Sequence, residues 1–254
     1  MTTLHENHEL SVPSLYSPVA IDAAGDATAA AEKLARSGAD PATLVWARRE
    51  DRLDTAVVLG PETPFTEALL VAYVTAVAIG DTLGALIPPA VPVTFGWPDR
   101  ILLNGATVGG IRILHAAMES DAVPDWMVVG LQIAIKLDLT ADPGVAANRT
   151  SLAEEGIVDV GAVDLLESFS RHFLFWINRW QDEGFAPVKT AWLGRAAGYG
   201  PNQDMELAGD WARRKLLWLH ADGSVQYAET EPGGDGEEIT ATLADALTRP
   251  SWSF

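Results

Sequence analysis

The chain has 254 residues, 48% of them hydrophobic and 20% charged, a composition typical of a folded globular protein long enough for one large domain and a small one. Its formal net charge of −18 argues against nucleic-acid or anionic-membrane partners, because phosphate contacts require clustered Lys and Arg. The absence of cysteine excludes disulfides, thiolate zinc sites and a cysteine nucleophile.

The N-terminal segment, "MTTLHENHEL", lacks the basic and apolar regions of a secretory signal, so we expect a cytoplasmic protein. The first helix is expected over Ala27 to Arg36. Asp26 is suited to cap its start, and Gly38 is suited to end it. The five histidines show no convincing metal-ligand spacing, so we expect no metal site.

Two strands and a long helix are expected next. The strands are "ATLVWAR", residues 42–48, and "TAVVLG", residues 55–60. The helix runs from about Phe65 to Leu86 and stops before two prolines. Its longest apolar stretch, residues 68–80, is shorter than the about 20 residues needed to span a bilayer. We therefore expect a buried core helix and no membrane partner.

The stretch "TFGWPDRILLNGATVGGIRI", residues 94–113, indicates a hairpin. Asn104-Gly105 forms its tight turn, which needs positive φ at both positions. The Gly109-Gly110 pair on the returning strand has two readings: a bulge or close backbone contact, or a surface against which a ligand lies. Residues 126–138 predict another strand, which we expect beside this hairpin.

A second long helix is predicted from Val160 to about Gln181. Four aromatic residues recur on one helical face, a pattern that favours core packing over a cofactor site. These residues are Phe169, Phe173, Trp176 and Trp180.

The sequence pattern changes near residues 200–204. This change predicts a domain boundary, which divides the chain into residues 1–203 and 204–254. The second part is expected to be β-rich, with a hairpin turn at Asp222-Gly223.

Four segments in this order resemble the catalytic domain of the biotin and lipoate protein ligase family. Residues 96–100, "GWPDR", are similar to the family's K-W-P-N-D, and residues 107–111, "TVGGI", to its K-x-G-G-I. Residues 130–134 are similar to its G-x-G-I-N strand and residues 150–152 to its T-S-L segment. The resemblance implies an α/β fold of the α+β type: a mixed β-sheet with helices mainly on one side, followed by a small C-terminal β-rich domain.

The resemblance also implies a chemistry. Ligases of this family activate a carboxylate with ATP to an acyl-adenylate, which a lysine of an acceptor domain then attacks. ATP and biotin or lipoate are therefore the expected cofactors if the chain is active. The expected partners are a small carboxylic acid or its acyl-adenylate and a biotinyl or lipoyl acceptor domain, and a homodimer is left open.

The resemblance and the local basic residues together give a set of candidate ligand-binding positions. Their common feature is that each lies in or beside one of the matching segments or in the loop that corresponds to the family's basic loop. They are Arg48, Arg49, Trp97, Asp99, Arg100, Thr107, Gly109, Gly110, Arg112, Ile133, Arg149, Thr150 and Ser151.

Several departures from the family pattern concern positive charge. Thr107 stands where the family has a lysine that stabilises the adenylate. The basic glycine-rich loop is replaced by "ARREDRLDTAVV", which contains no glycine. Among four lysines, Lys136 alone lies on a strand expected to line the site, so it is the candidate catalytic lysine. Arg112 and Arg149 are alternative sources of charge.

Three functions remain open from the sequence. The first is a divergent biotin or lipoate ligase-like enzyme that binds a carboxylic acyl group and transfers it to an acceptor lysine. The second is a catalytically inactive member that binds a biotinyl or lipoyl domain or a small acid. The third is a related core adapted to another acyl or amide transfer.

Overall fold

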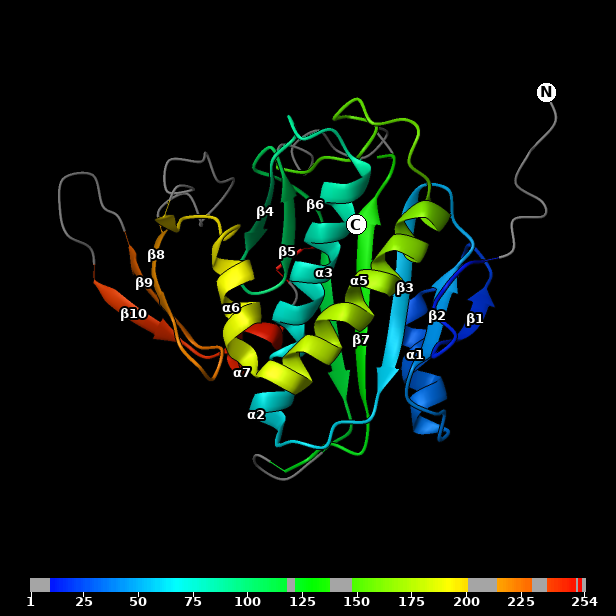
Figure 1. Ribbon diagram of the computed structural model, residues 1–254, viewed down its shortest axis with the longest axis horizontal. Helices are drawn as coiled ribbons and strands as arrows, with labels where there is room; N and C mark the ends of the chain where they lie inside the picture. Colours follow the sequence, from blue (N-terminus) through cyan, green and yellow to red (C-terminus); the bar gives the residue numbers. More distant parts are fainter. Residues whose placement is uncertain are drawn as a thin grey trace.

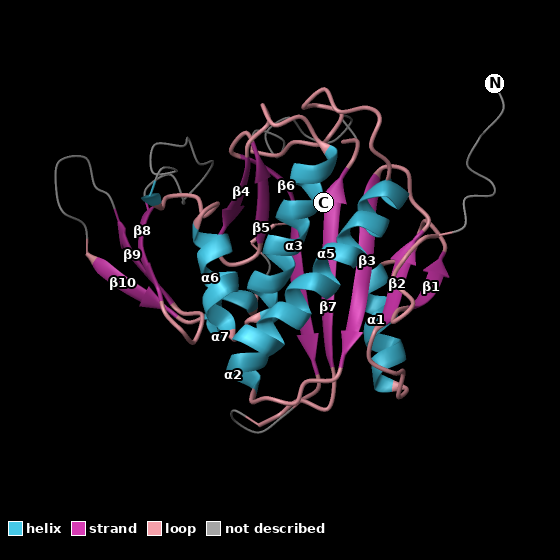
Figure 2. Ribbon diagram, in the orientation of Figure 1, coloured by secondary structure: helices cyan, strands magenta, loops and turns pink. Residues whose placement is uncertain are grey.

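The computed structural model describes residues 10–117, 122–137, 148–200, 214–229, 237–249 and 251–252. The signal-peptide prediction at residues 1–9 and the predicted boundary at residues 203–204 lie outside these ranges. The described chain forms a large mixed sheet, a small antiparallel sheet and helices packed around them (Figures 1 and 2). This is the α/β architecture that the sequence predicts.

The large sheet has seven strands in the order β1-β2-β3-β7-β6-β5-β4. The pair β1 and β2 is parallel, and every other neighbouring pair is antiparallel. The predicted hairpin strand β6 therefore lies beside β7, as expected. The strands are β1 (Ser17–Ile21), β2 (Thr43–Ala47), β3 (Arg52–Leu59), β4 (Val93–Gly96), β5 (Arg100–Leu103), β6 (Ala106–His115) and β7 (Met127–Ala134).

The described helices are α1 (Ala27–Arg36), α2 (Phe65–Ala68), α3 (Val71–Leu86), α5 (Ala162–Glu183), α6 (Phe185–Leu193) and α7 (Leu243–Leu247). Helix α1 has the predicted bounds, because Asp26 accepts a hydrogen bond from the Ala29 N–H at 2.9 Å and Gly38 adopts a φ of +85°. The predicted long helix is divided into α2 and α3. The division lies at Leu69 and Leu70, where the amide of Leu70 bonds to the carbonyl three residues earlier.

One face of the large sheet packs against α3 and α5 and forms the main core (Figure 1). Phe169 and Phe173 of α5 stack with ring centroids 5.3 Å apart and are almost completely buried. This confirms that the aromatic face of α5 is core. Residues Phe65–Leu86 are long and apolar enough to cross a membrane, but 78% of the most apolar window is buried inside the structure. They form a core helical segment of this fold.

The opposite face of the sheet carries one described helix, α1. The alanines of α1 pack against small apolar residues of β2, β3 and β7, and together they form a second, smaller apolar cluster. A Cβ on Gly130 of β7 would lie 2.1 Å from the Thr28 hydroxyl oxygen, so glycine at this position lets α1 approach the sheet closely. The helices therefore lie mainly on one side, with α1 as the exception.

The predicted hairpin contains an additional strand. The Asn104-Gly105 turn joins β5 to β6 with φ values of +48° and +82°, as the sequence predicts. The preceding Trp97-Pro98 peptide is cis and lies in the turn from β4 to β5, so residues 93–115 form a three-stranded meander. The motif residues at its start therefore occupy a turn at the edge of the sheet.

The small sheet has the order β10-β9-β8, with strands β8 (Arg214–Leu219), β9 (Val225–Glu229) and β10 (Glu238–Ala241). The predicted turn at Asp222-Gly223 joins β8 to β9, with a φ of +80° at Gly223. The Tyr73 hydroxyl of α3 donates a hydrogen bond of 2.6 Å to the Gly223 carbonyl. The small sheet is thus tied to the helical face of the large one.

Candidate functional site

A row of polar and glycine positions crosses the α1 face of the large sheet. Asp54 of β3 pairs in register with Gln132 of β7, which pairs with Gly110 of β6, which pairs with Arg100 of β5. Paired residues on neighbouring strands point to the same face. The next row, Ala56 and Gly130, is covered by α1. The polar row therefore begins where the helix stops covering the strands.

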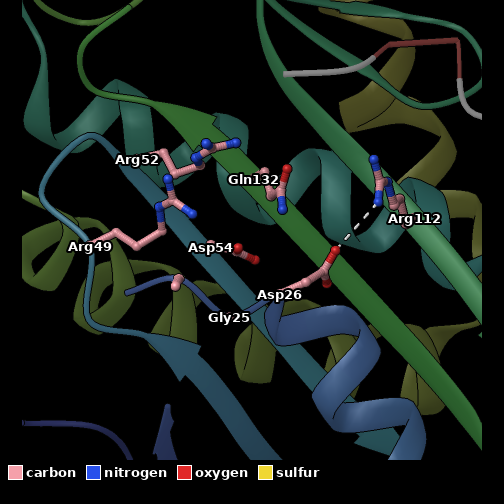
Figure 3. Close-up of a pocket in the computed structure, with 8 residues that line it drawn as sticks. Gly25, Asp26, Arg49, Arg52, Asp54, Arg112 and Gln132 are labelled. Atoms are coloured by element: carbon pink, nitrogen blue, oxygen red, sulfur yellow. Dashed lines mark ion pairs between the residues drawn. The ribbon is translucent and has the colours of Figure 1, made fainter. Parts of the chain in front are cut away.

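A pocket of about 210 Å³ opens above this row (Figure 3). Its lining combines charged and amide side chains of β3, β6 and β7 with Arg49 of the β2–β3 loop and with the loop before α1. The lining residues are Ala24, Gly25, Asp26, Arg49, Arg52, Asp54, Arg112 and Gln132. The loop before α1 and the strands β3, β6 and β7 thus bring together residues that are more than a hundred positions apart in the sequence.

Asp54 lies at the floor of the pocket and is 2% exposed. Burial raises the pKa of its carboxyl group, hydrogen bonds from the Gln132 amide and the Ala27 N–H partly oppose this, and the negative charge of Asp26 adds to it. Within the described residues, its Oδ1 atom has no hydrogen-bond partner. A buried carboxyl group with one free oxygen and a raised pKa is typical of a binding or catalytic position.

Two arginines at one end of the pocket share a carboxylate. Arg49 makes a bidentate salt bridge with Asp51, with both nitrogen–oxygen distances at 2.9 Å. Arg52 Nε lies 3.2 Å from the same carboxylate. Partial burial raises the pKa of Asp51, but the Arg49 hydrogen bond and both guanidinium charges outweigh this and lower it. Asp51 therefore neutralises part of the positive charge near the pocket.

Arg112 lines the other end of the pocket and is less firmly paired. Its Nη1 atom lies 3.8 Å from the Asp26 carboxylate, at the long limit of an ion pair (Figure 3). Its Nε atom is buried and, among the described residues, has no hydrogen-bond partner. This guanidinium is thus available to an anionic group placed in the pocket.

The two glycines of the sequence motif are each close to a different part of the chain. A Cβ on Gly109 would lie 2.0 Å from the backbone oxygen of Gln132, so β6 and β7 approach too closely for any side chain. A Cβ on Gly110 would lie 2.1 Å from Nε1 of Trp252. Gly109 is therefore a structural glycine, whereas Gly110 receives an indole ring from a distant part of the chain.

The segment Ser251–Trp252 is fastened to this face of the sheet. The backbone N–H of Ser251 donates to the Asp99 carboxylate at 2.9 Å, and its hydroxyl donates to the other carboxylate oxygen. The Trp252 Nε1–H donates to the Ile111 carbonyl at 3.2 Å. Burial raises the pKa of Asp99, and the two bonds from Ser251 lower it in part. Asp99 thus holds a segment of this chain.

Four other predicted site residues lie together beside β6. Thr107 forms a parallel β-bridge with Arg149, through backbone bonds of 2.9 Å on either side of it. The Thr150 hydroxyl donates to Glu155 at 2.6 Å, and Ser151 is completely buried. Desolvation lowers the pKa of Arg149, and the nearby charge of Arg52 lowers it further. The predicted T-S-L segment therefore does reach the hairpin, near the arginine end of the pocket.

Other predicted residues lie away from the pocket lining. Trp97 is buried in the main core, where its Nε1–H donates to the Tyr73 hydroxyl at 2.8 Å. Ile133 points into the same core, opposite to Gln132. Arg48 is exposed, and Lys136 is exposed at a bend after β7. Their roles in ligand binding stay predictions, and none of these four side chains lines the described pocket.

Arg100 lies between the contacts of the Ser251–Trp252 segment and the edge of the sheet. It pairs with Gly110 on one side and Gly96 on the other, and its Nε would be 3.2 Å from a Cβ on Gly96. Desolvation lowers its pKa, and the neighbouring Asp99 carboxylate opposes this. Its partly buried guanidinium therefore extends the polar row beyond Gly110.

Comparison with known proteins identifies the family. The model described as "Biotin/lipoate A/B protein ligase family" matches residues 12–194. This chain belongs to that family. The biotin–[acetyl-CoA-carboxylase] ligase of Paracoccus denitrificans is 30% identical over 156 residues, which are 61% of this chain and 65% of the relative. The bifunctional ligase/repressor BirA of Bacillus subtilis is 24% identical over 74% of this chain and 57% of its own length. Each match thus spans less than two thirds of the relative.

Solved structures place the fold in the same biotin/lipoate ligase family. A biotin protein ligase-like protein of unknown function from Silicibacter sp. has a TM-score of 0.79 and 31% identity, and the match covers 95% of this chain and all of that one. The biotin protein ligase of Aquifex aeolicus, solved with biotin and ATP, has a TM-score of 0.65 and 15% identity, with 89% and 96% covered. The second likeness shows the fold alone.

Several pocket residues of this ligase-family chain escape sequence reasoning. Asp54 and Gln132 each interrupt an apolar strand. A polar residue in a central strand is the one sequence feature that could have marked either of them as a site residue. Arg52 lies in the segment that replaces the family's basic loop, and the sequence predicts Asp26 only as a helix cap. Trp252 gave no signal, because its contacts join positions 141 residues apart.

Proposed function

We propose that this protein is a biotin/lipoate ligase-like protein that binds a small carboxylic acid, or its activated acyl form, in the pocket on the α1 face. The observation that carries the proposal is the convergence of Arg49, Arg52 and Arg112 with the Gln132 amide on one cavity. Guanidinium groups and amides are suited to hold a carboxylate or phosphate oxygen. The cytoplasm is the expected location of this activity.

The supporting geometry assigns different tasks to the pocket residues. Arg112 lines the pocket with a guanidinium that is held by Asp26 only at 3.8 Å, and it can donate to an anionic oxygen. Asp54 keeps one oxygen free and has a raised pKa, which favours its protonated form as a donor to a ligand carbonyl or carboxylate. Both groups point into the same pocket (Figure 3).

We expect adenylation to be weak. Thr107 stands at the position of the motif lysine and is tied by backbone bonds to residues 148–150. Arg49 and Arg52 are held by Asp51, which offsets the positive charge that a pyrophosphate leaving group needs. Transfer to an acceptor-domain lysine is the second candidate function, and the nearness of Arg149 to Arg52 favours it, because this pair supplies local positive charge.

Thermal unfolding with a series of acids tests the proposal. The series is propionate, butyrate, hexanoate, octanoate, lipoate and biotin, each with and without Mg·ATP. A ligand at about 100 times its Kd stabilises the folded state by about 2.7 kcal/mol, which gives a measurable rise in Tm. We expect at least one acid to raise Tm. If none does at millimolar concentration, the binding proposal is wrong.

Pyrophosphate release separates the two functions. The assay contains the protein, Mg·ATP, biotin or lipoate, and a biotinyl or lipoyl acceptor domain. We expect release near background. Robust turnover, with label appearing on the acceptor lysine, would replace the binding function with the ligase function and direct attention to Arg112, Arg149 or Lys136 as the substitute cation.

A further inference from the structure

The space next to the pocket is filled by a side chain of the same protein. Gln132 lines the pocket, and its neighbour in register, Gly110, lies one strand away, about 4.8 Å across the sheet. Gly110 has no side chain, yet the space above it is taken by the Trp252 indole. Trp252 is 7% exposed, so the ring is buried against the sheet.

Arg112 connects the pocket with the indole. Its guanidinium carbon lies 5.2 Å from the centroid of the Trp252 ring, and the same side chain lines the pocket and approaches Asp26. The indole therefore lies directly behind the guanidinium at the hairpin end of the pocket. Cation–π contact of this kind fixes the position of an arginine side chain.

The attachment of Trp252 is specific. Ser251 donates twice to the buried Asp99 carboxylate, and the indole N–H donates to the Ile111 carbonyl. These bonds fix both the backbone before the ring and the ring itself. The backbone of Gly110 does not require glycine through a positive φ, so the absence of its Cβ serves the contact with the ring.

The pocket that remains beside the indole has a polar lining. Apart from Ala24 and Gly25, every lining residue carries a charge or an amide. Long acyl chains and ring systems need an apolar wall to leave water, and sites for such ligands are mostly apolar. The remaining cavity is thus suited to a short acid whose carboxylate meets Arg112.

We propose that Trp252 is a specificity-determining residue that restricts the pocket to short carboxylic acids. It occupies the space over Gly110 that would otherwise extend the pocket along the hairpin and receive an acyl chain or ring. This inference rests on the proposed function, since it names the class of acid that the pocket takes. Removing the indole opens the space above Gly110 and extends the pocket across β6.

Isothermal titration of the intact protein tests this inference with butyrate, octanoate and biotin. In the wild-type protein we expect butyrate to bind more tightly than octanoate or biotin. In Trp252→Ala we expect the affinity for octanoate or biotin to rise about tenfold or more, with a change of less than threefold for butyrate. Trp252→Phe, which keeps a smaller ring, is expected to lie between the two.

Trp218→Ala is the matched control, because Trp218 is an exposed tryptophan on β8 and contacts Lys189. It is expected to keep the wild-type order of affinities. Circular dichroism reports whether each variant is folded, and Trp252→Phe carries the test if Trp252→Ala unfolds.

The outcomes separate the two proposals. An unchanged order of affinities in folded Trp252→Ala and Trp252→Phe, or wild-type protein that already prefers octanoate or biotin, overturns the role of Trp252 and leaves the binding function in place. Absence of binding by the wild-type protein and all variants, for every acid, overturns the binding function and with it the role of Trp252.

Discussion

The two faces of the large sheet are built from the same strands but differ in almost every physical property. On the face under α3 and α5, β7 contributes Leu131 and Ile133 to a closed apolar core. On the other face, the residue between them, Gln132, lines a polar pocket. The alternation of a β-strand makes this division possible, because neighbouring residues point to opposite sides. Stability and ligand chemistry can therefore change independently on the two faces.

The largest expected effect comes from breaking the core face. Phe173 of α5 is 1% exposed and stacks on Phe169. Truncation to alanine removes a buried ring and leaves a cavity, so Phe173→Ala is expected to cost about 3–5 kcal/mol of unfolding free energy. Urea denaturation measures this loss. A cost below about 1 kcal/mol would contradict the description of this face as closely packed.

The adjacent glycines Gly109 and Gly110 allow the two faces to be compared within the single strand β6. Gly109→Ala forces a methyl group against the backbone of β7, and we expect a loss of about 1–3 kcal/mol, since a paired strand cannot move aside. A methyl group on Gly110→Ala meets the Trp252 indole first, and displacing this buried side chain breaks its hydrogen bond to the Ile111 carbonyl. We expect a smaller loss than for Gly109→Ala, of about 1 kcal/mol, with a changed Trp252 fluorescence. Equal losses for the two variants would remove the distinction between them.

The pH dependence of stability tests the electrostatics of the pocket face. Because the pKa of Asp54 is raised in the folded state, its contribution to stability is present below its unfolded pKa of about 3.9 and is lost as the pH rises through the folded pKa. Asp54→Asn cannot ionise. We therefore expect it to gain stability relative to the wild-type protein as the pH increases from about 4 to about 8. Urea midpoints across this range measure the difference.

Asp222 provides a control of opposite sign. Hydrogen bonds from Ser224 lower the pKa of its carboxyl group, so its contribution is present above the unfolded pKa and is lost as the pH falls through the folded pKa. Asp222→Asn should therefore lose stability relative to the wild-type protein at neutral pH and recover it in acid. A flat difference for Asp54→Asn beside the expected slope for Asp222→Asn would show that Asp54 is not destabilised by burial.

The smallest effect is expected at the solvent side of α1. Arg36 makes an ion pair with Glu32 one turn earlier, and its side chain is 61% exposed. Exposed pairs of this kind contribute little, so Arg36→Ala should change the free energy of unfolding by about 0.5 kcal/mol or less. Thermal unfolding at low and high salt measures it. A loss above about 1 kcal/mol would mean that α1 depends on Arg36 for its docking, through this pair or through the contact of its guanidinium with the Trp126 ring.

Local patterns predicted the architecture well, because its signals are short in range. The cap at Asp26, the stop at Gly38 and the Asn104-Gly105 turn each depend on neighbouring residues, and each lies where expected. The sequence does not predict the break between α2 and α3, since the residues around Leu69 and Leu70 are apolar and include no Gly or Pro. Helical periodicity also identified the buried aromatic face of α5.

The pocket was predicted only in part, because it is assembled by register between distant strands. Arg49 and Arg112 were expected and line it, whereas Lys136 was expected and is exposed outside it. The Gly109-Gly110 pair indicated that another group lies close to this backbone. For Gly110 the neighbour is Trp252, whose indole bonds to Ile111, 141 positions earlier, and a contact between such distant positions leaves no mark in the local sequence.

Isothermal titration of butyrate into Arg112→Gln tests the central claim most directly, which is that the polar pocket on the α1 face is the ligand site. Arg36→Gln is the control, because it removes an exposed arginine of α1 that does not line the pocket. We predict that Arg112→Gln raises the Kd about tenfold, equivalent to about 1.4 kcal/mol, while Arg36→Gln leaves it unchanged. Equal affinity in Arg112→Gln and the wild-type protein would contradict the claim.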